Sequence, residues 1–149
     1  MSRVALLDVN VLVALFDSEH VHHDLAHDWF ADHRAHGWAT CPITENGFFR
    51  VLTNPACGHD ALRPDVLMKA LRKFRASGHH HFWPDSVSLA DESLFNLAHA
   101  PSHRQLTDAY LLGLATKMKG HLATFDRTIP VKAVVGATVT SLHVIAPVD

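Results

Sequence analysis

Short apolar runs alternate along the chain with longer stretches in which apolar residues recur every three or four positions. The short runs predict buried strands, and the longer stretches predict amphipathic helices. The predicted strands cover 4–7, 38–41, 80–83, 121–125, 131–135 and 142–146. The predicted helices cover 9–16, 22–35, 43–53, 65–76, 89–97 and 104–119. This alternation predicts an α/β fold with a mostly parallel sheet, in which ligands bind where strands end and helices begin.

The chain contains no internal repeat, low-complexity tract or Ser/Gly-rich linker. Helix-breaking residues fall where the periodic patterns stop, as at Gly37, Asn54-Pro55, Gly78 and Gly120. A length of 149 residues is enough to enclose one hydrophobic core. We therefore expect residues 1–149 to form a single domain.

Composition narrows the class of protein. Hydrophobic residues make up 48% of the chain, but no apolar run reaches the roughly 18 residues of a membrane span. The apolar N-terminal stretch is interrupted by Asp8 and Asn10, which is not typical of a signal peptide. Two cysteines, Cys41 and Cys57, are too few for a disulfide framework and favour a reducing compartment. We expect a soluble, cytoplasmic protein without a membrane partner.

The charge balance argues against a uniformly basic, nucleic-acid-binding surface. The net charge is −2 with histidine neutral, so any binding of nucleic acid has to use a local patch. Fourteen histidines are scattered along the chain, with one cluster at His79-His80-His81. We interpret them as a bias of surface composition. Metal binding by the triplet is the less favoured alternative, because the sequence has no Cys or His partner at zinc-site spacing from it.

The stretch LLDVNVLVAL places polar residues inside an otherwise apolar run. Asp8 ends the first predicted strand, and Asn10 follows two residues later. A buried carboxylate is costly unless something pairs with it. Asp8 therefore either caps the helix that follows it or holds a charged ligand.

Three further carboxylates occupy similar places. Glu45 stands three, four and seven residues before apolar side chains in TENGFFRVL, and Asp108 stands at the same spacings in QLTDAYLLGLA. Each is thereby predicted to share a helix face with residues of the core, near the N-terminus of its helix. Asp126 follows the predicted strand 121–125, as Asp8 follows the first strand.

In an α/β fold, all four carboxylates come from one end of the sheet and converge on one pocket. Clustered carboxylates raise each other's pKa, and a bound divalent cation relieves their repulsion. A ligand set made of oxygen atoms favours Mg²⁺ or Mn²⁺. Such ions activate water and stabilise charge on a phosphoryl group. The residues therefore indicate metal-assisted hydrolysis of a phosphodiester.

The sequence at this point resembles the PIN-domain ribonucleases, specifically the VapC-type toxins of toxin–antitoxin systems. The matching stretches are LLDVNVLVAL, TEN at 44–46, LTDAYLLGLA at 106–115 and LATFDR at 122–127, and they span nearly the whole chain in the family's order. The resemblance implies a three-layer α/β/α PIN-like fold with a mostly parallel central sheet. It also implies that the catalytic residues are Asp8, Glu45, Asp108 and Asp126. We expect the metal to contact Asp8, Asp108 and Asp126 and to reach Glu45 through water.

The resemblance carries further expectations. It implies that Asn10 and Thr107 support the acidic site. It implies endoribonuclease action on structured RNA such as tRNA or ribosomal RNA. It also implies a homodimer and inhibition by a cognate VapB-type antitoxin.

Two surfaces are candidates for contacts with partners. The predicted helix 65–76 is basic opposite its apolar stripe, at Lys69, Arg72, Lys73 and Arg75. That face is either merely solvated, or it contacts RNA phosphates or an acidic antitoxin segment. Helices 43–53 and 65–76 also carry apolar residues in excess of what a small domain easily covers, which predicts a two-fold dimer through them. These apolar residues are Val51, Leu52, Leu67, Leu71 and Phe74.

Other functions fit the sequence less well. A phosphatase of the haloacid dehalogenase type needs a second aspartate two residues after the first, and that position is Asn10. A signal receiver needs a lysine on a late strand, and the predicted strand 121–125 has none. A catalytically inactive PIN-like module that binds RNA or an antitoxin is the alternative we retain. The complete set of acidic residues argues against it.

Overall fold

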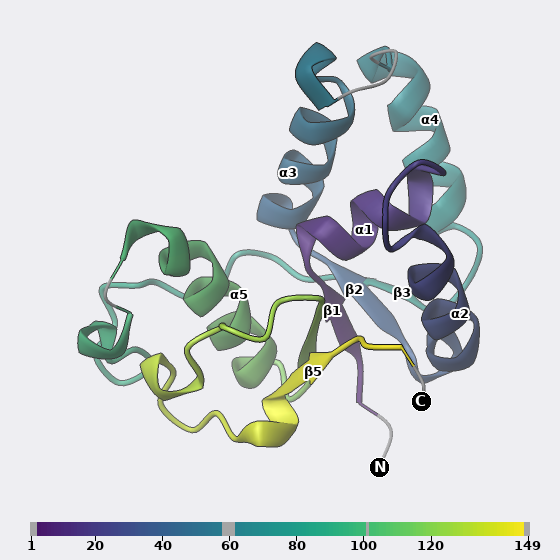
Figure 1. Cartoon of the computed structure of the whole chain (residues 1–149). Helices are drawn as coiled ribbons and strands as arrows, with labels where there is room; N and C mark the ends of the chain where they lie inside the picture. The colour runs from purple at the N-terminus through teal and green to yellow at the C-terminus, as the bar shows by residue number, and fades with distance from the viewer. Residues whose placement is uncertain (1–2, 58–61, 101, 148–149) are drawn as a thin grey trace.

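The fold is described by a computed structural model for residues 3–57, 62–100 and 102–147, and it is built on a parallel sheet in the order β3-β2-β1-β4-β5 (Figure 1). The strands are Ala5–Leu7 (β1), Trp38–Thr40 (β2), His80–Phe82 (β3), His121–Thr124 (β4) and Leu142–Val144 (β5). The α-helices are Val9–Phe16 (α1), His23–His33 (α2), Pro42–Leu52 (α3), Pro64–Arg75 (α4) and Leu106–Lys117 (α5). Short 3-10 helices cover Arg34–His36, Pro55–Cys57, Leu97–His99, His103–Gln105, Val131–Ala133 and Val139–Ser141. Within the described ranges, no helix is long and apolar enough to cross a membrane.

Helices cover both faces of the sheet and make three layers, as predicted. Successive residues of a strand point to opposite faces, so the fully buried strand β1 needs apolar partners on both sides. Ala5 and Leu7 pack into a core cluster with residues of α1, α2, α3 and α4. Leu6 packs on the opposite face with α5, which lies on the other side of the sheet from α1 and α2 (Figure 1). The predicted α/β/α fold is therefore confirmed.

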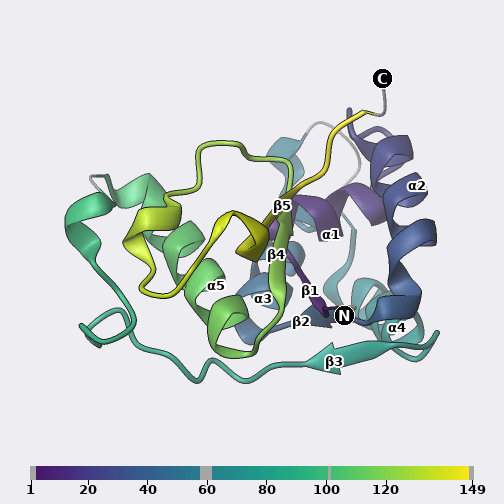
Figure 2. The ribbon, with the colours of Figure 1, turned by 90° about the horizontal axis from the view of Figure 1, so that it is seen from below.

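The order of the strands fixes where a ligand can bind. After β1 the chain forms β2 and β3 on one side, crosses the sheet, and returns as β4 on the other side of β1 (Figure 2). Leu6 of β1 is in register with Ala39 of β2 and Leu122 of β4. Open α/β sheets bind ligands at the carboxyl ends of strands where the winding reverses, which here lies between β1 and β4. Asp8 and Asp126 follow these two strands.

A glycine allows α3 to lie directly against the start of α1. A Cβ atom at Gly47 would lie 2.8 Å from Cγ2 of Val9, too close for an undisturbed contact. Val9 follows Asp8 directly, and Gly47 lies two residues after Glu45. The close approach therefore places the first turn of α3 beside the carboxyl end of β1.

Two predicted elements are wrong. The stretch 89–97 lies wholly within the described residues and contains no α-helix. It forms a turn instead, in which the Asp91 carboxylate accepts a hydrogen bond from the Ser93 N–H (2.9 Å). The stretch 131–135 begins with a 3-10 helix instead of a strand, and Val134 forms an isolated bridge with Phe95. A Cβ atom at Gly113 of α5 would clash with the Phe95 ring. The two segments thus serve to pack Phe95 against α5, an interaction that local periodicity does not reveal.

The apolar residues behind the predicted dimer lie mainly in the core of the chain. Leu52, Leu67 and Leu71 are at most 3% exposed, and Phe74 packs against the same core cluster. Val51 is 37% exposed. The premise that these residues supply spare apolar surface is therefore wrong, because α1 and α2 already cover most of them.

Candidate active site

Asp8 is a buried carboxylate at the junction of β1 and α1. It is 7% exposed and is the N-cap residue of α1. Its Oδ1 accepts a hydrogen bond from the Val9 N–H (2.8 Å), and its Oδ2 accepts one from the Thr124 hydroxyl (2.7 Å). Burial raises the pKa of Asp8 and Asp126 raises it further, whereas the two hydrogen bonds lower it. The side chain is therefore a helix cap and also a neighbour of other carboxylates.

Thr124, which the sequence pattern does not single out, connects two of the predicted site residues. It is the last residue of β4 and is 1% exposed. Its hydroxyl donates to Asp8 and accepts from the Asp126 N–H (3.1 Å). The available signal was a hydroxyl residue ending an apolar strand, two positions before an aspartate. A buried hydroxyl of this kind is expected to be hydrogen-bonded.

Asp126 is held in a turn just after β4. Its Oδ1 accepts hydrogen bonds from the N–H (2.7 Å) and the hydroxyl (2.6 Å) of Thr128. These contacts, together with the bond from its own N–H to Thr124, fix the side chain at the switch point of the sheet. Asp126 is thus an ordinary turn aspartate by its local bonds, and its charge acts on both Asp8 and Asp108.

Asp108 lies in the first turn of α5, on the opposite side of the sheet from α1. Burial raises its pKa to about 6, and the charges of Asp8 and Asp126 contribute to the increase. A charge acts on another group in this way only when the two lie near each other. The structure therefore brings together Asp8, Asp108 and Asp126 from three separate elements.

The chemistry of the three aspartates fits a hard divalent cation. All their donors are carboxylate oxygens, and each oxygen of Asp8 accepts one hydrogen bond and so keeps a lone pair. Among the described residues, no group of three or more His, Cys, Asp or Glu side chains is arranged to hold a metal ion as it stands. The three aspartates therefore supply suitable ligand atoms but do not form a ready-made metal site in this arrangement.

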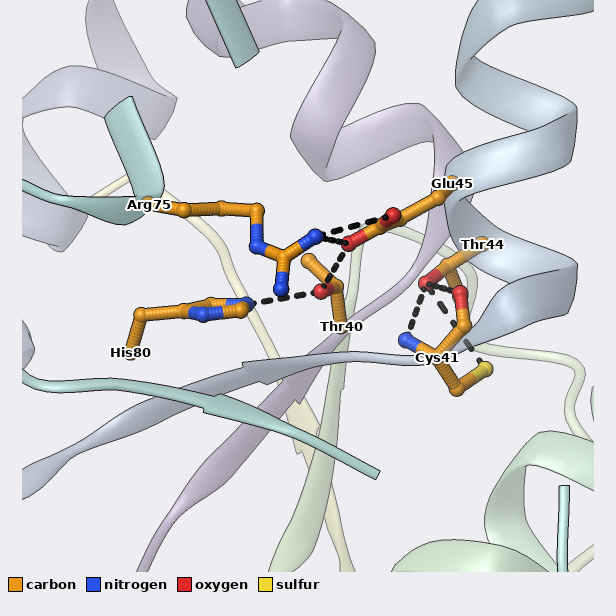
Figure 3. A network of polar contacts seen from close by, with 6 residues as sticks. All are labelled: Thr40, Cys41, Thr44, Glu45, Arg75 and His80. Atoms are coloured by element: carbon orange, nitrogen blue, oxygen red, sulfur yellow. Dashed lines mark hydrogen bonds and ion pairs between the residues drawn. The ribbon is translucent and has the colours of Figure 1, made fainter. Parts of the chain in front are cut away.

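Glu45 lies in a different environment from the three aspartates. Its Oε2 accepts a hydrogen bond from the Thr40 hydroxyl (2.6 Å) and lies 3.3 Å from Nη1 of Arg75 (Figure 3). It is not among the charges that raise the pKa of Asp8 or Asp108. The structure thus places Glu45 at the same edge of the sheet but turned toward β2 and α4.

The predicted supporting residues are accessible to solvent. Asn10 lies in the first turn of α1 and Thr107 in the first turn of α5, and both are exposed. Each is next to or two residues from a site aspartate, as the sequence requires. Their supporting role stays a prediction.

Comparison with known proteins gives consistent matches over most of the chain. Residues 5–134 match a family model described as the PIN domain. The chain is 42% identical to ribonuclease VapC44 of Mycobacterium tuberculosis over 137 residues, which cover 90% of this chain and 94% of that protein. It is 45% identical to ribonuclease VapC38 of the same organism over 123 residues, covering 83% and 85%. It is 39% identical to ribonuclease VapC39 over 132 residues, covering 89% and 95%.

Proposed function

Since the chain belongs to the PIN-domain family and, within it, to the VapC ribonucleases, we propose that it is a metal-dependent endoribonuclease. It hydrolyses phosphodiester bonds in RNA as the toxin of a toxin–antitoxin pair. The catalytic residues are Asp8, Glu45, Asp108 and Asp126. Mg²⁺ is the cofactor, and Mn²⁺ can replace it.

One observation supports this proposal above the others, the mutual repulsion of three aspartates. The pKa of Asp108 is raised to about 6 by burial and by Asp8 and Asp126. A protein gains nothing in stability from gathering like charges at a half-buried site. A divalent cation converts this repulsion into attraction, so the arrangement makes sense as a binding site that is completed by metal.

The chain's own residues have distinct tasks in this proposal. Asp8 and Asp126 are fixed by hydrogen bonds and provide two rigid sides of the site. Among the described residues no hydrogen bond restrains the Asp108 carboxylate, so it can adjust to an ion. Glu45, beside them on α3, orients water at the edge of the site. The bound ion supplies Lewis-acid stabilisation of the phosphoryl group and lowers the pKa of a bound water.

The remaining expectations concern assembly and partners. We propose that the substrate is a structured RNA such as tRNA or ribosomal RNA, met in the cytoplasm. A cognate VapB-type antitoxin holds the toxin inactive by placing an arginine among the aspartates, where its charge replaces that of the metal. We also propose a homodimer, now resting on the family alone. Light scattering at micromolar concentration tests it, and a monomeric mass would refute it.

Cleavage of RNA by the purified, antitoxin-free protein is the direct test. We expect discrete cuts in total RNA with Mg²⁺, mapped by sequencing the new ends, and none with a chelator. Asp108→Asn is the matched control, because it keeps the size of the side chain and removes its charge. If the parent protein binds RNA or antitoxin but cuts nothing under any metal condition, the chain is the inactive binding module instead.

A further inference from the structure

Beside the aspartates, a second polar network joins β2, β3, α3 and α4. Thr40 ends β2, His80 begins β3, Glu45 lies in the first turn of α3, and Arg75 ends α4. Their side chains point toward one another in Figure 3. Proximity in the sequence does not explain why these four side chains lie together, because they come from four different elements.

The hydrogen bonds of this network have a definite direction. The Thr40 hydroxyl has one proton, which it donates to Oε2 of the Glu45 carboxylate (2.6 Å). Nε2 of His80 lies 2.7 Å from the same hydroxyl oxygen and must therefore donate to it. Thr40 thus fixes the Glu45 carboxylate from the side of the sheet and leaves it facing Arg75.

The Arg75 guanidinium has contacts on two sides but does not use all of its hydrogen-bond donors. Its Nη1 lies 3.3 Å and 3.4 Å from the two Glu45 oxygens, and its Cζ lies 5.2 Å from the centre of the Phe82 ring. Among the described residues, every hydrogen bond and ion pair of the guanidinium runs through Nη1. The side chain is 35% exposed. Nη2 and Nε therefore remain available to a ligand, in an orientation set in advance.

Arg75 borders a hollow of about 490 Å³ whose described lining residues are Arg72, Arg75, Ala76 and His80. Two of these described residues are arginines, and none of them is acidic. A planar guanidinium with two free N–H donors matches the geometry of a phosphate. The hollow is therefore suited to an anion.

The hollow lies next to the acidic site and not elsewhere on the surface. Arg75 contacts Glu45, and Gly47 in the next turn of α3 touches Val9, which follows Asp8. Arg75 therefore lies at the same edge of the sheet as Asp8, joined to it through α3 and the start of α1. On its own this edge would repel RNA, because the net charge of the chain is −2 and the site is acidic.

We propose that Arg75 and Arg72 form a binding site for a backbone phosphate of the RNA strand, adjacent to the phosphate that is cleaved. Glu45 and Phe82 hold the Arg75 guanidinium in the binding orientation. This inference rests on the proposed function, because it assigns the neighbouring phosphate of the same substrate.

Binding in the absence of cleavage tests the inference. Fluorescein-labelled bulk tRNA is titrated with the protein in chelator, and the anisotropy is followed between 50 and 300 mM KCl. We expect Arg75→Gln to weaken binding about tenfold and to lower the slope of log affinity against log salt by about one, as for one lost phosphate contact. In steady-state cleavage the same variant should raise KM, because the strand loses a phosphate contact.

A matched control is available on the same helix. Arg63 precedes α4 and pairs with Asp65 at 2.8 Å, but both side chains are more than half exposed and lie at the opposite end of α4. Arg63→Gln should leave affinity and salt slope as in the parent. Equal values for Arg75→Gln and Arg63→Gln would overturn the inference. So would a fall in kcat without a change in KM, because Arg75 would then act on the chemistry.

Two further variants keep the test decisive. If melting curves show that Arg75→Gln is misfolded, Arg72→Gln on the exposed side of the same hollow must lower the salt slope by about one, and an unchanged slope would refute the site. Arg75→Lys should keep the salt slope and lose affinity. Lysine keeps the positive charge but lacks the planar guanidinium that donates two hydrogen bonds to one phosphate. Failure of the proposed function looks different: the parent would then not cut total RNA with Mg²⁺, whatever the arginine variants do to tRNA binding.

Discussion

Carboxylates at the same edge of the sheet experience opposite electrostatic conditions. Between β1 and β4, the charge of Asp126 adds to the burial that raises the pKa of Asp8, and the charges of Asp8 and Asp126 add to the burial that raises the pKa of Asp108. Beside β2, Glu45 faces Arg75 and accepts a hydrogen bond from Thr40. Among the described residues, no cation pairs with the three aspartates, whereas Glu45 pairs with Arg75. The two regions therefore differ in the ligand that each would attract. The region between β1 and β4 fits the proposed metal cation, and the region beside α4 fits the proposed phosphate of the RNA.

The largest expected effect comes from removing a charge in the aspartate region. Asp108→Asn should lower RNA cleavage by about a thousandfold or more, because the ion loses a ligand. The metal-free variant should be more stable than the parent near pH 7, by roughly 1–2 kcal/mol after allowance for partial exposure, or about 3–6 °C in Tm. Cleavage assays and thermal melts in chelator measure the two changes.

A purely structural role of Asp108 would give a different result, and this provides the control. In the first turn of α5, asparagine keeps the size of the side chain and loses only the weak interaction of its charge with the helix dipole, so a purely structural Asp108 would tolerate the change with full activity. Added Mg²⁺ should raise the Tm of the parent and barely affect Asp108→Asn. Retained cleavage by the variant would show that the mechanism is wrong.

The periodic parts of the chain could be predicted because burial imposes their pattern. Helix α1 was predicted with its observed bounds, since it is apolar almost throughout and starts directly after its N-cap residue Asp8. The stretches 89–97 and 131–135 could not be predicted, because they follow the shape of α5 around Gly113 and Phe95. Such long-range packing has no local period.

The candidate site shows the same difference between what could and what could not be predicted. The positions of Asp8 and Asp126 follow from strand ends, and the winding order of the sheet brings them together. The partners of Glu45 could not be inferred, because Arg75 lies 30 residues away on another helix and Thr40 looks like any strand residue. Spacing indicates which face a side chain occupies, but the fold decides which charges it meets.

The second-largest expected effect is a pH dependence of stability that comes from the aspartate region. The folded-state pKa of Asp108 is about 6, above the ordinary aspartate value of 3.8. A raised pKa means that the protonated acid favours folding, and this contribution is lost as pH rises through the folded pKa. The stability difference between Asp108→Asn and the parent in chelator should therefore grow from about pH 4 to above pH 6 and then level off.

The difference between variants is the quantity to measure, because other groups titrate nearby. Burial lowers the pKa of His80 and His121 to about 4, so their protonation destabilises the fold at acid pH in both proteins. Urea unfolding at several pH values gives the two curves. Parallel curves over this range would mean that neither burial nor the other aspartates raise the pKa of Asp108.

The third expected effect links the two regions through Gly47. Gly47→Ala should destabilise the protein by about 1 kcal/mol, because overpacking against Val9 outweighs the better helix propensity of alanine. Val9→Ala in the same chain should restore part of that loss by removing the clashing methyl groups. Urea unfolding of the three variants measures this. A Gly47→Ala protein as stable as the parent would show that α3 is free to move away from α1.

The smallest expected effect tests the sign of the coupling in each region. Glu45→Gln should lower stability by only about 0.5–1 kcal/mol, since the pair with Arg75 is partly exposed. In a double-mutant cycle with Arg75→Gln, the coupling should be favourable and should shrink in 1 M salt. The same cycle with Asp8→Asn and Asp108→Asn should give an unfavourable coupling in chelator, because these charges repel. Both couplings come from urea unfolding. Equal signs would remove the contrast between the two regions, and with it the argument that one binds a cation and the other an anion.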